Sequence, residues 1–166
     1  MEHNFPRRKH PRLKEYDYSM PGAYFITICT QDKRCLLSRI VGQGLAPAEI
    51  RLTEYGAIAA EQLLLLEKRY PFVKVDRYVI MPNHIHIILL LEENAESVRR
   101  PAVSDIVCAY KSLTTKSCKQ KRPIAKLFQT SFYDHVIRGR EDYLGIAEYI
   151  ENNPKQWELD KLYMKE

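Results

Sequence analysis

Two histidines stand one residue apart at the start of an apolar run, in the segment MPNHIHIILLL of residues 81–91. Side chains two residues apart on a β-strand point to the same face, so His84 and His86 project together while Ile85 and Ile87 face the opposite side. Two neutral imidazoles that converge on one point make half of a divalent-metal site. A pair of core histidines bonded to the backbone is the competing interpretation, and the shared face with its apolar flanks favours metal ligands.

Few other residues could complete a closed metal site. The four cysteines, Cys29, Cys35, Cys108 and Cys118, have no CxxC spacing, and we interpret them as reduced, mostly buried thiols. His135 is the remaining histidine outside the first residues of the chain, and packing of its strand is its favoured role. The sequence therefore predicts an open site with few protein ligands, as a catalytic metal site requires.

A nucleophile is expected from the last helical segment, AEYIENNP. Tyr149 and Asn153 are four residues apart, so a helix presents the phenol and the amide oxygen on one face. A tyrosine near a two-histidine metal site suggests phosphoryl transfer from a nucleic-acid backbone, in which the phenolate attacks in line and forms a covalent phosphotyrosine. The pKa of free tyrosine is about 10, so attack at neutral pH needs a metal's field or a base.

The elements that must position these residues follow a βαββαβ order with one further helix. This order predicts an α+β, ferredoxin-like fold: a four-stranded antiparallel sheet with helices on one face, plus a C-terminal helix carrying the tyrosine. Hydrophobic periodicity, turn residues and caps set the bounds. The expected strands are 23–31, 72–82, 84–92 and 128–138, the expected helices run from Thr53 to 70, from Ser104 to 120 and over 141–153 before Pro154, and a small hairpin is expected within 42–49.

The chain of 166 residues suits one domain. We expect a basic N-terminal arm over 1–20, a single catalytic domain over 21–157 and a C-terminal tail over 158–166. No apolar run is long enough to cross a membrane. The N-terminal residues are charged and lack the apolar core of a signal peptide, so a cytoplasmic protein is expected.

Positive charge is concentrated in two segments of the sequence. The net charge is +5 and the pI is about 9.0. Two solvated faces would explain the clusters, but two of them in one small basic domain favour a nucleic-acid partner. The candidate DNA-binding residues are Arg7, Arg8, Lys9, Arg12 and Lys14 in the arm, and Lys111 and Lys116 in the second helical segment.

The ordered set of motifs resembles a known family. His84-Ile85-His86 is a His-hydrophobic-His (HUH) motif, and it occurs with YVIMPNHIHIILLL, AYKSLTT, FYDHVIR and the closing AEYIENNPKQW. From about Tyr16 to Trp157 the chain is similar to the single-tyrosine HUH transposases, and within them to the REP-associated tyrosine transposases.

This resemblance implies roles for individual positions. His84 and His86 match the motif's metal ligands, Tyr149 matches the nucleophile, and Asn153 matches a polar residue, often glutamine in relatives, that can complete the metal site. The implied cofactor is Mg²⁺ or Mn²⁺. The implied activity is cleavage and rejoining of single-stranded DNA near REP-like hairpins, through a 5′-phosphotyrosine and a free 3′ hydroxyl, with the basic segments on the DNA backbone.

Two other functions stay open at this point. One is a non-catalytic, domesticated protein that binds single-stranded hairpin DNA, and the other is a metal-dependent nuclease that uses water. The sequence also leaves open whether the chain acts as a monomer or as a homodimer.

Overall fold

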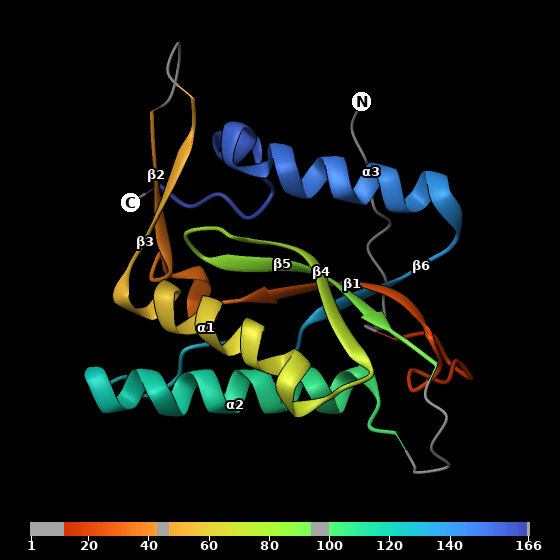
Figure 1. Cartoon of the computed structure of the whole chain (residues 1–166). Helices are drawn as coiled ribbons and strands as arrows, with labels where there is room; N and C mark the ends of the chain where they lie inside the picture. Colours follow the sequence, from red (N-terminus) through yellow and green to blue (C-terminus); the bar gives the residue numbers. More distant parts are fainter. Residues whose placement is uncertain (1–11, 43–46, 94–99, 166) are drawn as a thin grey trace.

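Four antiparallel strands form the central sheet, in the order β4-β5-β1-β6 (Figure 1). The computed structural model describes residues 12–42, 47–93 and 100–165. The two central strands pair so that Cys29 lies opposite His84 and Thr27 lies opposite His86. The strands are β1 (Gly22–Cys29), β4 (Val73–Ile80), β5 (His84–Leu91) and β6 (Tyr133–Ile137).

Helices cover both faces of this sheet. Helices α1 (Glu54–Arg69) and α2 (Val103–Lys121) lie on one face, and α3 (Gly139–Asn152) lies on the other (Figure 1). α3 leads directly into a short 3-10 helix, η2 (Asn153–Leu159), which has Pro154 in its first turn. A proline is tolerated there because the first amide groups of a helix have no partner within it. The predicted α+β plan, with two helices on one face and a C-terminal helix carrying the tyrosine, is confirmed.

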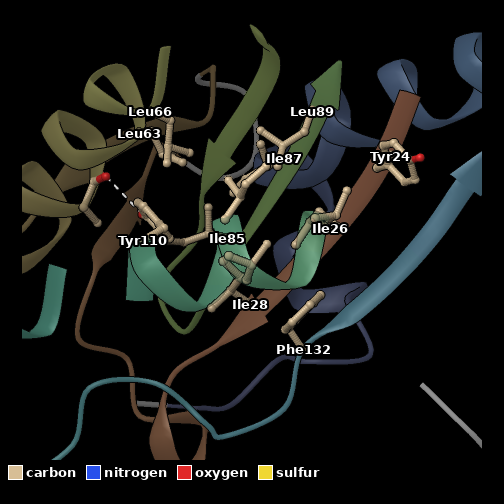
Figure 2. Close-up of a cluster of buried hydrophobic side chains, with 14 of the residues drawn as sticks. Tyr24, Ile26, Ile28, Leu63, Leu66, Ile85, Ile87, Leu89, Tyr110 and Phe132 are labelled. Atoms are coloured by element: carbon tan, nitrogen blue, oxygen red, sulfur yellow. Dashed lines mark hydrogen bonds between the residues drawn. The ribbon is translucent and has the colours of Figure 1, made fainter. Parts of the chain in front are cut away.

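Alternation along the strands produces two separate apolar layers. Ile85 and Ile87 of β5 point towards α1 and α2 with their neighbours on β1 (Figure 2), and they are at most 1% exposed. In the same layer Tyr110 of α2 is buried, and its hydroxyl donates to the carbonyl of Ala59 on α1 at 3.0 Å (Figure 2). This bond satisfies the one polar atom that the aromatic side chain brings into the core. The second layer lies under α3 and consists of Phe25, Val79, Met81, Ile88, Ile146, Ala147, Ile150 and Trp157.

The two predicted helix caps have different outcomes. Thr53 caps α1 as predicted, because its hydroxyl accepts a hydrogen bond from the amide of Gly56 at 3.1 Å. Ser104 was the wrong cap for α2, which begins at Val103. The carboxylate of Asp105 instead accepts from the amide of Ala102 at 3.0 Å, so an acid inside the first turn stabilises this terminus.

Strand β6 is shorter than the predicted 128–138. The segment before it runs beside β1 without joining the ladder, and Phe128 forms only an isolated bridge with Thr30. The final helix begins at Gly139, two residues earlier than predicted. Gly139 has a φ of 84°, which glycine adopts without steric strain.

A two-stranded ribbon, β2 (Ser38–Val41) with β3 (Glu49–Leu52), flanks the segment in which a hairpin was expected. A 3-10 turn, η1 (Gln31–Lys33), precedes it. Gly56 of α1 packs against the backbone at its base: a Cβ on this residue would lie 1.9 Å from the carbonyl oxygen of Leu37. Since the amide of Leu37 donates to the carbonyl of Pro82 at 2.9 Å, this close approach fixes the turn that leads into His84.

No helix in the described part of the chain has the length and apolar character needed to span a membrane.

Candidate active site

The two motif histidines lie side by side on β5, on the face covered by α3. His84 is fully buried and His86 is 3% exposed, and their ring centroids are 4.5 Å apart. The shared face expected from the two-residue period is therefore present. Both rings are enclosed by the second apolar layer, with Phe25 and Trp157 at ring-centroid distances of 5.2 Å from His86 and 5.9 Å from His84.

Asn83 fixes the protonation of His84. Its Nδ2 donates to the carbonyl oxygens of Leu162 at 2.7 Å and Lys33 at 3.2 Å, which leaves Oδ1 facing Nδ1 of His84 at 2.8 Å. Because an amide oxygen can only accept, Nδ1 of His84 carries the proton and Nε2 keeps its lone pair. This is the tautomer that binds a metal through Nε2, and a partner on Nδ1 is the usual outer contact of such a ligand.

His86 has an equivalent partner. Its Nδ1 lies 2.8 Å from the hydroxyl of Thr27, the residue directly opposite it on β1. In the tautomer in which Nδ1–H donates to this hydroxyl, Nε2 of His86 also presents a lone pair. Both imidazoles are then held by their Nδ1 atoms and turn their Nε2 atoms into the same buried space.

A carboxylate from the chain beyond η2 completes the cluster. Each of His84, His86 and Asp160 offers a ligand atom within 4.8 Å of those of the other two. Oδ2 of Asp160 lies 3.8 Å from Nε2 of His84 and accepts from Nδ2 of Asn153 at 2.6 Å. Its Oδ1 accepts from the amide of Leu162 at 2.7 Å, so the carboxylate is held at both oxygens.

Burial keeps the two imidazoles neutral. It lowers the pKa of His84 to about 4, against the opposing effect of the Asp160 carboxylate. Burial, with His84 beside it, also lowers the pKa of His86 well below its ordinary value. At neutral pH both rings are therefore neutral donors, and binding of a cation does not have to displace a proton from them.

Tyr149 of α3 projects towards the same cluster. Its ring centroid lies 5.1 Å from that of His86 and 6.3 Å from that of Phe25. Its hydroxyl donates to Oδ2 of Asp160 at 3.4 Å. Burial and the adjacent carboxylate both raise the pKa of Tyr149 above its ordinary value, so this phenol holds its proton at neutral pH.

Two polar contacts fix α3, and with it Tyr149, on the sheet. On one edge, Nε2 of His135 lies 2.8 Å from Oδ2 of Asp142, which also accepts from the amide of Arg138 at 2.8 Å. On the other edge, the hydroxyl of Tyr143 donates to Oδ2 of Asp76 at 2.7 Å. His135, assigned to strand packing from the sequence, thus joins the edge strand β6 to the first turn of the tyrosine helix.

The site fits a divalent cation on its own geometry. Among the described residues, three buried polar atoms have no hydrogen-bond partner: Nε2 of His84, Nε2 of His86 and Oδ1 of Asn153. An orphaned buried polar atom costs about 1–3 kcal/mol, so three around one point mark a place for a ligand. Two imidazole nitrogens, a carboxylate and an amide oxygen form a mixed nitrogen and oxygen ligand set for a divalent cation.

The structure places the predicted site residues together and shows which residues were missed. His84, His86, Tyr149 and Asn153 all surround one buried space. Asp160 was missed because it falls in the expected tail of 158–166, and no spacing in the sequence relates it to the histidine motif. Asn83 and Thr27 were also missed, although Asn83 directly precedes the motif and could have been considered as a partner of His84.

The predicted DNA-binding residues divide between two locations. Arg12 lies near Asp134, at 4.0 Å, and over the ring of Phe132 at 5.3 Å, while Lys14 is exposed. Lys111 and Lys116 lie on α2, on the face of the sheet opposite α3 (Figure 1). Arg7, Arg8 and Lys9 lie outside the described residues.

Comparison with known proteins gives relatives that extend over nearly the whole chain, although no protein-family model matches it. An uncharacterized protein of Haemophilus influenzae is 34% identical over 173 residues, which cover 95% of this chain and 93% of the relative. The REP-associated tyrosine transposase of Escherichia coli strain K12 is 23% identical over 137 residues, covering 82% of this chain and 68% of that protein.

The fold is shared with a solved structure. The structure of a REP-associated tyrosine transposase bound to a REP hairpin is 21% identical, with a TM-score of 0.63, over 86% of this chain and 72% of that one. The named relatives place the chain among DNA-acting proteins of the transposase class. More particularly, the chain belongs to the REP-associated tyrosine transposase family, as its motifs predicted.

Proposed function

We propose that this protein is a metal-dependent, single-tyrosine nuclease and strand transferase that acts on single-stranded DNA near REP-like hairpins. The observation that carries the proposal is the convergence of Tyr149, His84, His86 and Asp160 on one space that also contains three orphaned polar atoms. A hairpin ligand is adopted from the family, one of whose members is solved bound to a REP hairpin.

The cation that fits this site is Mg²⁺ or Mn²⁺, held by His84, His86 and Asp160, with the amide oxygen of Asn153 as a further ligand. When bound, it supplies a positive charge that stabilises the charge developing on the scissile phosphate. This assignment departs from the sequence-based one in a single respect: the carboxylate of Asp160 joins His84, His86 and Asn153 as a fourth protein ligand, which strengthens binding of a hard cation.

The chain's own residues would carry the covalent step. The hydroxyl of Tyr149 donates to Oδ2 of Asp160 at 3.4 Å, and its proton would pass to solvent water as the positive charge of the bound cation favours the phenolate. The phenolate oxygen bonds to phosphorus, the bond between phosphorus and the 3′ oxygen breaks, and that oxygen takes a proton from water. The products are a 5′-phosphotyrosine and a free 3′ hydroxyl, and the phosphodiester energy is kept for rejoining.

The basic side chains are proposed to hold the DNA backbone. Arg12, Lys14, Lys111 and Lys116 are the described members of the two predicted clusters. Contacts to phosphates make binding strongly dependent on salt, so this role predicts weaker binding as ionic strength rises.

A covalent adduct tests the catalytic proposal. The full chain is incubated with Mn²⁺ and an end-labelled hairpin that carries a single-stranded flank, and is then run on a denaturing gel. Wild-type protein and the control Tyr133→Phe, which changes a 63% exposed tyrosine, should form a labelled protein band. Tyr149→Phe should form no band, and a native gel run in parallel should show that it still binds the hairpin.

The denaturing gel and a native gel of the same samples separate the alternatives. Hairpin binding by the wild type without any adduct would support the non-catalytic DNA-binding protein, an alternative favoured by the burial of both histidines. Cleavage that survives Tyr149→Phe would support a nuclease that uses water. Either result would overturn the strand-transferase proposal.

A further inference from the structure

A groove lies along α2, on the face of the sheet away from Tyr149. It has a volume of about 710 Å³ and is bounded by α2 on one side and by residues 126–130 on the other. Four of its lining residues are lysines, and no acidic side chain lines it in the described part of the chain. The lining lysines are Lys111, Lys116, Lys119 and Lys126.

Two of these ammonium groups converge on one neutral residue. Nζ of Lys111 donates to the carbonyl oxygen of Thr130 at 2.7 Å, and Nζ of Lys126 donates to the hydroxyl of Thr130 at 2.7 Å. Burial lowers the pKa of Lys111. Two like charges beside a shared acceptor repel one another, and no carboxylate in the lining compensates them, so the site favours an anion.

The other lining groups indicate what kind of anion fits. Lys111 and Lys119 are eight residues apart on one helix, about 12 Å along its axis, which is long enough for more than one phosphate of a nucleic-acid strand. Gln120, Gln129 and Thr115 add neutral hydrogen-bonding groups. Phe128, the aromatic residue in the lining, is 3% exposed, so it offers no platform on which a base could stack. The groove is therefore suited to the backbone of DNA and not to its bases.

The groove reaches the same end of the sheet as the candidate active site. The amide of Gln129 donates to the carbonyl of Cys29 at 2.9 Å, and the amide of Gln31 donates to the carbonyl of Leu127 at 2.8 Å. Cys29 is the residue directly opposite His84 on the sheet. DNA held in the groove therefore lies on one face of this sheet end, while the histidines lie on the other.

We propose that the groove between α2 and residues 126–130 is a second DNA site, which binds backbone phosphates of a segment that is not being cleaved. Thr130 is its centre: it holds Lys111 and Lys126 together, and Lys116 and Lys119 continue the site along α2. The inference rests on the proposed function for its ligand, DNA, and it adds a site that takes no part in the covalent step. It raises affinity without changing the reaction of bound DNA.

The double variant Lys111→Gln/Lys126→Gln tests the site, and Lys68→Gln/Lys74→Gln is a matched control. Lys68 and Lys74 are solvent-accessible and outside the groove, and both double variants remove two charges. Binding of a fluorescent hairpin with a single-stranded flank is measured by anisotropy over a salt series in EDTA, which prevents cleavage. The groove variant should bind about tenfold more weakly at low salt, with a slope against log[salt] smaller in magnitude by about 1–2.

A charge-conserving variant and two shorter probes sharpen the result. Lys111→Arg/Lys126→Arg should keep the wild-type salt slope, because phosphate binding needs the charge. Two shorter probes, a blunt-ended hairpin stem and the unpaired flank alone, show which part of the DNA occupies the groove. The loss of affinity in the glutamine variant should appear with the probe that contains this part. The inference would be overturned if the glutamine variant kept the wild-type affinity and salt slope for all three probes. It would also be overturned if the control variant lost as much affinity as the groove variant.

Adduct formation separates this inference from the proposed function. At limiting DNA with Mn²⁺, adduct formation by the groove variant should fall by the same factor as its affinity, while the control Lys68→Gln/Lys74→Gln should keep the wild-type rate. A slower rate at saturation with unchanged affinity would overturn the inference. If the wild type forms no adduct while the groove variant still loses affinity, the catalytic proposal fails and the groove stands.

Discussion

The hydroxyl of Tyr149 donates to Oδ2 of Asp160 at 3.4 Å. η2 makes this contact possible, because it turns the chain immediately after α3 and returns Asp160 to the site. Nε2 of His84 is 3.8 Å from the same carboxylate oxygen. One oxygen thus links the candidate nucleophile to the candidate metal ligands, and four predictions follow from this arrangement and its supports.

Asp160→Asn should greatly reduce stabilisation by Mn²⁺. The change keeps the shape of the side chain and removes the charge that would face the cation. A ligand that binds only the folded state stabilises it by about 2.7 kcal/mol at 100 times its Kd, so the wild type should melt at a higher temperature with Mn²⁺ than with EDTA. Glu158→Gln, an exposed change on η2, is the control. A wild-type Mn²⁺ shift in Asp160→Asn would exclude the carboxylate as a ligand.

Asn153→Asp should make the apo protein less stable and its response to Mn²⁺ larger. The amide of Asn153 donates to Oδ2 of Asp160 at 2.6 Å. A carboxylate at this position would face Asp160 with like charge, and a divalent cation would relieve the repulsion. Melting curves in EDTA and in Mn²⁺ measure both effects. Equal Mn²⁺ shifts in the variant and the wild type would place Asn153 outside the metal site.

Asn83→Ala should weaken Mn²⁺ binding by about 10–100-fold, the usual effect of removing an outer partner of a metal ligand. Without Oδ1 of Asn83, which lies 2.8 Å from Nδ1 of His84, the ring is no longer restricted to the tautomer with a free Nε2. Titration of Mn²⁺ against the melting temperature gives the affinity. Thr114→Val provides a comparison, because it removes a buried hydroxyl that bonds the carbonyl of Tyr110 far from the site. Thr114→Val is expected to lower the stability without changing the Mn²⁺ affinity. The same result for Asn83→Ala would assign Asn83 a purely structural role.

Gly56→Ala should destabilise the fold by about 1–3 kcal/mol or more, because the added Cβ would lie 1.9 Å from the carbonyl oxygen of Leu37 and the backbone must shift. Gly139→Ala is the matched comparison. There φ is 84° but no atom lies within 4 Å of the added Cβ, so only the cost of a left-handed alanine, about 1–2 kcal/mol, is expected. Urea unfolding monitored by circular dichroism gives both values. A smaller effect at Gly56 than at Gly139 would contradict the close packing of α1 on the loop before β2.

The order of the elements and the direction of the histidines could be predicted because they depend on local periodicity. A two-residue alternation assigns His84 and His86 to one face of a strand wherever that strand is placed, and a four-residue spacing does the same for Tyr149 and Asn153 on a helix. The cap of α2 could not be predicted in this way. Ser104 and Asp105 are adjacent candidates, and which of them meets a free amide depends on the direction in which the chain enters the helix.

The ferredoxin-like α+β plan, the family resemblance and four residues of the candidate site could be predicted from the chain, because each follows from spacing within an element or from an ordered set of motifs. The partners of those four residues depend on how the chain folds. Asp160 reaches the site through the turn of η2, Thr27 holds the imidazole of His86 from the neighbouring strand, and Thr130 accepts hydrogen bonds from two lysines of separate segments. Such contacts join residues whose separation along the chain carries no period, so they are defined only once the chain has folded.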